Sequence, residues 1–204
     1  MTPEKIEQEI LDFLHRINSE SPFYLDVVPD PRSTVNGCFD NVEAKIRQDG
    51  GTKIVGWQIW KTKHLIEAEF HGVWKKPTGE IIDITPKAIK SIDKILFLPD
   101  YNQSYQGTNV DNIRWNITSN KLVDDLILAS ELIFLLLNKG NRVKFREVFL
   151  NQAENLKHQK LIQIKNGVVF MLSKDDTIHS GCFCGGQLTY KKCHAKELAK
   201  LSRA

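Results

Sequence analysis

Residues 67–74 read EAEFHGVW and residues 80–86 read EIIDITP, and these two segments decide the fold that the sequence predicts. In both segments apolar and polar residues alternate, which is the pattern of a β-strand. The intervening residues 75–79 (KKPTG) contain proline and glycine and are of a length suited to a hairpin loop. We therefore predict an antiparallel hairpin formed by these two segments.

The predicted hairpin brings a histidine and an aspartate together. If Trp74 pairs with Glu80, His71 lies directly opposite Asp83, with Cβ atoms about 5 Å apart on one face of the sheet. An aspartate at that distance can orient the imidazole and stabilise its cationic form. The alternative interpretation is that His71 serves packing or lies at the surface, as strand histidines commonly do.

Other segments have the periodicities of strands and helices. Strands are predicted near residues 53–60 and 95–98, and helices over residues 3–18, 38–49, 121–138 and 142–158. Asn166-Gly167 lies between two apolar runs, which predicts a second hairpin over residues 161–172. Residues 21–37 and 102–120 are rich in polar residues and are predicted to be loops. Antiparallel strands combined with helices indicate an α+β protein.

Cys38 begins the predicted helix over residues 38–49, directly after Asn36-Gly37, a pair suited to a sharp turn. The helix dipole and the free amide hydrogens of a helix N-terminus favour a thiolate, so a thiol at this position has a lowered pKa. This is a common way to make a nucleophilic cysteine. The alternative is a small buried residue, a role that free cysteine often has.

The chain order of these residues resembles that of papain-like cysteine enzymes, and more closely their transglutaminase-like branch. The resemblance spans about residues 35–90 and is carried by Cys38, Gly50-Gly51, Val55-Gly56, residues 71–74 (HGVW) and residues 83–86 (DITP). It implies a papain-like or transglutaminase-like core in which Cys38 is the nucleophile, His71 the general base and Asp83 the residue that orients the base. The implied chemistry is acyl transfer, as amide or peptide hydrolysis, deamidation or cross-linking. Asn36, Trp57 and Gln58 are candidate second donors to the oxyanion, beside the Cys38 amide.

Residues 182–194 (CFCGGQLTYKKCH) contain three of the four cysteines of the chain. With the adjacent histidine they supply four ligands of the kind that a closed tetrahedral zinc site uses. The predicted ligands are Cys182, Cys184, Cys193 and His194. The alternatives are a disulfide with one spare cysteine, or four unconnected residues, but disulfides are rare in a reducing cytosol.

The same run resembles the SEC-C motif, a small zinc-binding tail of the bacterial preprotein translocase and of other bacterial proteins. Gly185 and residues 190–192 (YKK) match the motif together with the four ligands, whereas Phe183 stands where the family usually has proline. The resemblance implies a structural Zn²⁺ and contact with a protein partner. The tail is also basic, which is compatible with ribosomal or nucleic-acid contact; the alternative is that these basic residues only form a solvated helix end. A catalytic zinc is not expected, because four protein ligands leave no position for water.

Length and composition indicate an ordinary globular protein. The chain has 204 residues, 41% of them hydrophobic and 26% charged, and its net charge of +3 is too small to argue for nucleic-acid binding by itself. Residues 1–18 lack an apolar signal core, and the apolar run over 126–137 is too short to span a bilayer, so a cytoplasmic location is expected. We predict a core over residues 1–120, a helical extension with a hairpin over 121–178 and a zinc knuckle over 179–204.

These observations favour a cysteine-dependent enzyme that acts on a protein or peptide substrate. The alternative is a non-catalytic adaptor that binds protein or nucleic-acid partners through the zinc motif.

Overall fold

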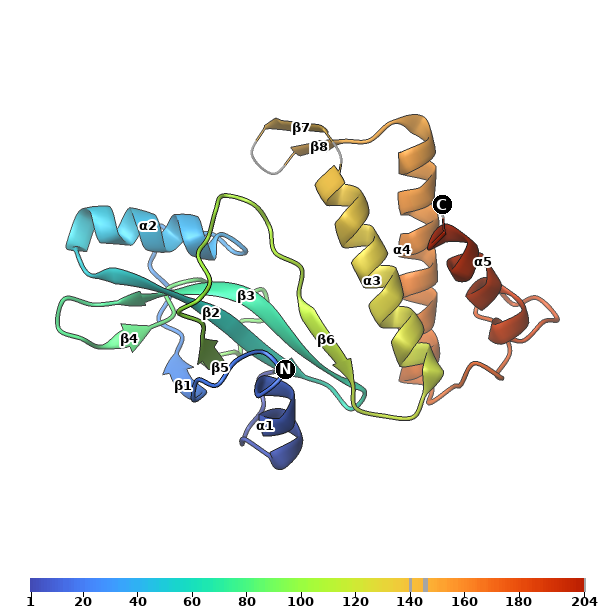
Figure 1. Ribbon diagram of the computed structural model, residues 1–204, viewed down its shortest axis with the longest axis horizontal. Coiled ribbons are helices and arrows are strands. Elements are labelled where there is room, and N and C mark those ends of the chain that lie inside the picture. Colours follow the sequence, from blue (N-terminus) through green and yellow to red (C-terminus); the bar gives the residue numbers. More distant parts are fainter. Residues whose placement is uncertain (140, 145–146, 204) are drawn as a thin grey trace. The chain divides into compact units, whose positions relative to one another are not determined.

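The computed structural model describes every residue except 140, 145–146 and 204 (Figure 1). The chain divides into two compact units, Met1–Ile117 and Thr118–Ala204. Helices and antiparallel strands are mixed along the chain, which confirms the predicted α+β class.

The first unit is built on a six-stranded sheet. The strands are β1 (Phe23–Asp26), β2 (Thr52–Lys61), β3 (Leu65–Lys75), β4 (Ile81–Ile82), β5 (Lys94–Pro99) and β6 (Ile113–Asn116). Their order is β1-β5-β2-β3-β4, and β6 pairs with the first residues of β3. Directly after β1 and β4, Val27 and Asp83 form a bridge that joins the two ends of the sheet. The sheet is therefore nearly closed.

The two long strands β2 and β3, side by side in Figure 1, carry the helices of this unit. Helix α1 (Gln8–Leu14) buries Ile10, Phe13 and Leu14 in a cluster with residues of β2, β3 and β5. Helix α2 (Cys38–Asp49) has the predicted bounds and packs Val42 and Ile46 against Trp74, Ile82 and Ile84. Burial of these apolar side chains supplies most of the attraction between helix and sheet.

Helix α2 ends at a tight turn that returns the chain to β2. Gly50 and Gly51 both have positive φ, 73° and 86°. A Cβ on Gly51 would also lie 2.3 Å from the Lys75 carbonyl oxygen. Only glycine satisfies both conditions.

The helix predicted over residues 3–18 is shorter than expected. Residues before Gln8 are not helical, because their polar groups bond to the sheet. The Met1 carbonyl accepts from the Lys61 amide, and the Thr2 hydroxyl donates to the Lys94 carbonyl. Two short strands, β1 and β6, occupy segments that were predicted to be loops.

The predicted pairing of the central hairpin is wrong by two residues. Trp74 pairs with Ile82 and Lys75 with Ile81, rather than Trp74 with Glu80. Because side chains alternate between the faces of a strand with a period of two, this shift leaves His71 and Asp83 on the same face.

The second unit is mainly helical and contains α3 (Lys121–Lys139), α4 (Gln152–Ser173), a 3₁₀ turn (Tyr190–Lys192) and α5 (His194–Leu201). The strands β7 (Asn141–Lys144) and β8 (Glu147–Phe149) pair with each other. Among the described residues, no helix combines the length and the apolar character that crossing a bilayer requires.

Two predictions in the second unit are wrong. The hairpin predicted over 161–172 is part of α4, and the helix predicted over 142–158 gives way to β7, β8 and the start of α4. Helix α4 begins after Asn151, whose side chain accepts from the Glu154 amide while the Glu154 carboxylate accepts from the Asn151 amide. This capping box satisfies two backbone donors and sets the start of the helix.

Candidate functional site

The structure brings Cys38, His71 and Asp83 together in the first unit. Cys38 is the first residue of α2, and its half-buried thiol is hydrogen-bonded to the His71 ring. The Nε2 atom of His71 lies 3.0 Å from Oδ2 of Asp83. Both partners of this pair are buried, with exposed fractions of 3% for His71 and 0% for Asp83. The arrangement places an imidazole between a thiol and a carboxylate.

An unpaired stretch of the β3 edge allows Cys38 to reach the sheet. Strand β3 pairs with β6 up to Ala68 and with β4 only from Trp74. Between these two pairings, the Gly72 backbone amide donates to the Cys38 sulfur. Phe39 packs on Gly72, where a Cβ would lie 3.0 Å from the ring, so the glycine permits the close approach of α2.

Asp83 is fixed by groups on either side of its carboxylate. Its Oδ1 atom accepts from the Thr85 backbone amide at 2.9 Å. Its Oδ2 atom, which faces His71, also contacts the Nζ atom of Lys87. The Thr85 hydroxyl in turn accepts from the amide of Asn41 in α2, which ties this loop to the helix that carries Cys38.

The charges of Cys38, His71 and Asp83 shift one another's pKa values toward the ionised forms. Burial would lower the pKa of His71, but the charges of Asp83 and Cys38 raise that pKa to about 10. Burial would raise the pKa of Asp83, but His71 and Lys87 lower it to about 2. Burial likewise favours the neutral thiol of Cys38, yet the charge and hydrogen bond of His71 leave its pKa below the ordinary value. At neutral pH His71 is therefore an imidazolium and Asp83 a carboxylate, and this pair favours the thiolate form of Cys38 over that of an ordinary thiol.

The structure distinguishes among the groups that were predicted to donate a hydrogen bond to an oxyanion near Cys38. The indole N–H of Trp57 donates to Asp100 Oδ2 at 3.0 Å and is therefore engaged elsewhere. Gln58 is 1% exposed; its carbonyl oxygen accepts from Lys87, whereas its donor atom, Nε2, has no hydrogen-bond partner among the described residues. Asn36 is exposed and precedes the helix with a φ of 61°. The Cys38 amide lies in the first turn of α2, where amides have no partner within the helix.

A second cluster lies in the second unit and consists of the four predicted metal ligands. One ligand atom from each of Cys182, Cys184, Cys193 and His194 lies within 4.8 Å of the others, so the cluster could hold a metal ion. The sulfur atoms of Cys184 and Cys193 are 3.9 Å apart. A tetrahedral ion with metal–sulfur bonds of about 2.3 Å separates its sulfur ligands by roughly 3.8 Å.

The histidine of this cluster has the orientation of a metal ligand. His194 Nδ1 lies 3.0 Å from the Cys182 sulfur and 3.3 Å from the Cys193 sulfur. Its other nitrogen, Nε2, lies 3.7 Å from a carboxylate oxygen of Glu197, one turn further along α5. A carboxylate on the second ring nitrogen is a common support for a metal-bound histidine.

Short turns of the backbone and a contact with α4 hold the four ligand residues in place. Gly185 has a φ of 74° and its amide donates to the Cys182 carbonyl, which turns the chain between the first two cysteines. The Phe183 ring lies 4.3 Å from the His194 ring and packs on Gly167 of α4. A Cβ on Gly167 would lie 2.4 Å from that ring. Gly167 is therefore a contact surface for the cluster and not a turn residue.

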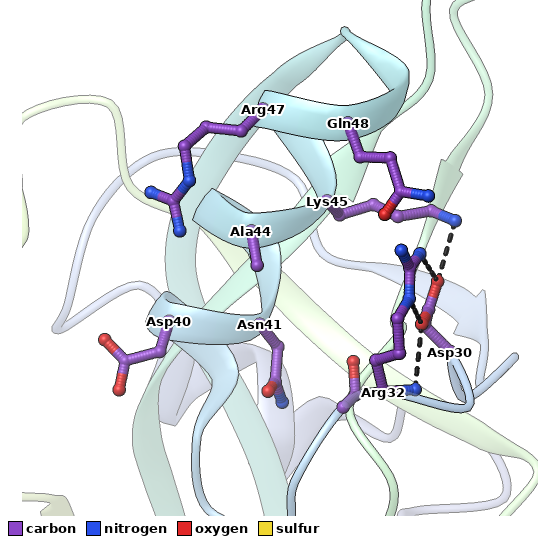
Figure 2. A pocket seen from close by; sticks show the side chains of 9 residues that line it. Asp30, Arg32, Asp40, Asn41, Ala44, Lys45, Arg47 and Gln48 are labelled. Atoms are coloured by element: carbon purple, nitrogen blue, oxygen red, sulfur yellow. Dashed lines mark hydrogen bonds and ion pairs between the residues drawn. The ribbon is translucent and has the colours of Figure 1, made fainter.

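A pocket of about 330 Å³ lies along α2, where its lining begins at Asp40, two residues after Cys38 (Figure 2). Figure 2 shows Asp30 between the side chains of Arg32 and Lys45, both of which bond to its carboxylate. These bonds hold the pKa of Asp30 well below its usual range. Two of the three cations that line the pocket, Arg32 and Lys45, are thus paired with an acidic residue of the chain.

No protein-family model matches the chain, and searches of curated proteins and of solved structures find no match either. The resemblances to transglutaminase-like enzymes and to the SEC-C motif rest on the residues of this chain.

Several residues of the candidate active site were not predicted from the sequence. Gly72, Thr85 and Lys87 all bond to members of the Cys38–His71–Asp83 group. The signal for Thr85 is its position two residues after Asp83, where a carboxylate can accept from the backbone of its own turn. Lys87 carries no comparable signal, because a lone lysine in a loop normally points into solvent.

Proposed function

We propose that this chain is a cysteine-dependent acyl-transfer enzyme in which Cys38 is the nucleophile, His71 the general acid and base, and Asp83 the residue that orients His71. The observation that carries the proposal is the buried His71–Asp83 pair, whose ring also bonds to a thiol at a helix N-terminus. A thiol activated by an adjacent base, with that base oriented by a third group, is the arrangement that nucleophilic catalysis requires.

In the first half-reaction, the Cys38 thiolate attacks the carbonyl carbon of an amide. A carbon–sulfur bond forms, and the carbonyl electron pair moves to oxygen, where the Cys38 amide and a further donor such as Asn36 stabilise it. The carbon–nitrogen bond then breaks, and the His71 imidazolium gives its proton to the leaving amine. A thioester on Cys38 remains.

In the second half-reaction, neutral His71 takes a proton from water while the water oxygen attacks the thioester carbon. The carbon–sulfur bond breaks, the carboxylic acid leaves, and the thiolate–imidazolium pair is restored. An amine in place of water gives cross-linking, and a glutamine or asparagine side chain as the first substrate gives deamidation. The substrate class that we propose is a peptide or protein amide.

For the second unit we propose a structural Zn²⁺ held by Cys182, Cys184, Cys193 and His194. The donor set of three thiolates and one imidazole suits zinc, and the spacing of the sulfur atoms fits a tetrahedral ion. Four protein ligands close the coordination sphere, so the ion would stabilise this part of the chain and take no part in acyl transfer. A zinc-stabilised tail would also be available for contact with a protein partner.

The proposed function is tested by alkylation of the full-length protein with iodoacetamide near pH 7. Peptide-resolved mass spectrometry separates Cys38 from the other three cysteines. We expect Cys38 to react about tenfold faster than N-acetylcysteine, because an ordinary thiol is only a few per cent thiolate at this pH. His71→Ala should remove this advantage, whereas His15→Ala, a change at an exposed histidine after α1, should not. A Cys38 that reacts like the reference thiol, and equally fast in His71→Ala, would contradict the proposal.

A further inference from the structure

The Lys87 side chain is held inside the first unit at the back of the proposed active site. Its side chain is 8% exposed, and its ammonium contacts Oδ2 of Asp83, the same oxygen that faces His71. It also donates to the carbonyl oxygen of Gln58 at 2.7 Å. Burying an ammonium is costly unless acceptors surround it, and these two acceptors meet that need.

The Cys38–His71–Asp83 mechanism by itself does not require a lysine. An aspartate that bonds only to histidine already orients the ring and stabilises the imidazolium. In this chain, however, two cations share one carboxylate oxygen. The Lys87 ammonium therefore changes how strongly the His71 imidazolium holds its proton.

The charged groups around His71 are few. Cys38 reaches it from α2, and Asp83 with Lys87 behind it reaches it from the segment after β4. Strand β2 contributes the neutral Gly56 and Gln58 to the His71 face.

Two acidic residues of the neighbouring strands have other partners. Glu69, two residues before His71 on β3, accepts from the Trp60 indole at 2.7 Å. Asp26 of β1 is exposed and pairs with Lys94 of β5. Lys87 is thus the cation that most directly modifies the Asp83–His71 pair.

We propose that Lys87 is a positioning residue of this site, which fixes the Asp83 carboxylate toward His71 and, through its charge, lowers the proton affinity of the His71–Cys38 pair. This inference rests on the proposed acyl-transfer function. An imidazolium between a thiolate and an unshared carboxylate would hold its proton too firmly to give it to a leaving amine. By sharing the carboxylate, Lys87 makes that proton easier to release.

Gln58 completes the arrangement. Its carbonyl oxygen, on β2, accepts from the same lysine ammonium that contacts Asp83. Removing the lysine charge would leave Asp83 with a single cationic partner. A nearby positive charge lowers the pKa of every neighbouring acid, so its loss should raise the pKa of both Cys38 and His71.

The inference is tested by the pH dependence of Cys38 alkylation by iodoacetamide in the full-length protein. In Lys87→Gln, which keeps a hydrogen-bond donor but loses the charge, the acid limb of the rate profile should move up by about one pH unit. In Lys87→Arg, which keeps the charge, the limb should stay within about 0.3 pH units of wild type. Lys45→Met is the matched control, because it removes a lysine paired with Asp30 and Asp49 instead of Asp83. It should leave the limb in place.

Gln58→Glu provides a second variant in case Lys87→Gln does not fold. It leaves Lys87 in place and offsets its charge with an added carboxylate, so it should also move the limb upward. A profile of Lys87→Gln or Gln58→Glu that coincides with wild type would overturn the inference, as would a Lys87→Arg profile that matches Lys87→Gln. If wild-type Cys38 itself shows no His71-dependent reactivity, the proposed function fails first, which distinguishes the two outcomes.

Discussion

In the candidate active site, the ionised form of each group is favoured by a group of opposite charge beside it. Cys38 bonds to His71, His71 to Asp83, and Asp83 to Lys87, so negative and positive groups alternate along the chain of contacts. His71 and Asp83 are buried, and in a low dielectric such a chain is stable only while all its members are present. Removing one member should therefore affect both the reactivity and the stability of the first unit.

Asp83→Asn should reduce the acid sensitivity of the first unit. The pKa of Asp83 is about 2 in the folded protein against an ordinary 3.8. Because this pKa is lowered by folding, the ionised carboxylate stabilises the fold fully above about pH 4, and that stabilisation is lost as the pH falls through 2. It amounts to about 2 kcal/mol.

Tryptophan fluorescence during urea unfolding measures this effect, because all four tryptophans (Trp57, Trp60, Trp74 and Trp115) lie in the first unit. At pH 7 the variant should be less stable than wild type, and the difference should shrink between pH 4 and pH 2. A difference that stays constant over this range would show that the carboxylate charge is not what stabilises the site.

At the scale of the elements, the sequence predicts the bounds of a helix or strand most accurately where the residues of that element themselves show a clear hydrophobic periodicity. The pattern of apolar residues is clear in helix α2 and in strands β2, β3 and β5. The bounds of these elements were predicted to within a few residues. The hairpin pairing was wrong by two residues, yet His71 and Asp83 still meet because that shift preserves the face of the strand. The strands β1 and β6 are short and depend on partners distant in the chain, β5 and β3, which local pattern cannot indicate.

The sequence could not predict the roles of residues whose contacts are with parts of the chain far away in sequence or that form only on folding. Asn166-Gly167 has the composition of a hairpin turn, but Gly167 lies within α4, where the Phe183 ring occupies the space that a Cβ would fill. In the sequence, Lys87 has the features of an ordinary loop residue, and its contact with Asp83 is seen only in the folded structure. In contrast, the four metal ligands are close in sequence, so their spacing alone predicts the cluster.

Gly167→Ala should weaken metal binding although alanine is the better helix former. A Cβ at this position would lie 2.4 Å from the Phe183 ring, and Phe183 lies between Cys182 and Cys184. The ring must move, and with it the adjacent ligands, which we expect to lower zinc affinity about tenfold or more.

Competition with a chromophoric chelator measures this affinity. The control is Asn166→Ala, at an exposed position one residue earlier in α4. Equal zinc affinity in Gly167→Ala and Asn166→Ala would show that Phe183 does not couple α4 to the cluster.

At the scale of the whole molecule, the two candidate sites belong to different units. Cys38, His71 and Asp83 lie in Met1–Ile117, whereas the metal ligands lie in Thr118–Ala204. Each unit has its own buried residues, so the metal cluster and the thiol site should respond separately to changes in their surroundings.

If the proposed Zn²⁺ is bound, its removal should therefore unfold the knuckle (residues 179–204) and spare the first unit. On addition of a strong chelator, the helical circular dichroism signal should fall as residues after 180 lose their support. The tryptophan fluorescence, which reports the first unit alone, should not change, and neither should the alkylation rate of Cys38. Loss of both signals together would indicate that the metal supports the whole chain.

The most direct test of the central claim is to follow an acyl group on Cys38 with p-nitrophenyl acetate. The account predicts a burst of nitrophenolate with one acetyl group added to Cys38, followed by loss of that acetyl group as His71 activates water. In His71→Ala the acetyl group should persist, and in Cys38→Ser the burst should be absent. An unmodified Cys38 in wild type, or an acetyl group that leaves wild type and His71→Ala at the same rate, would contradict the account.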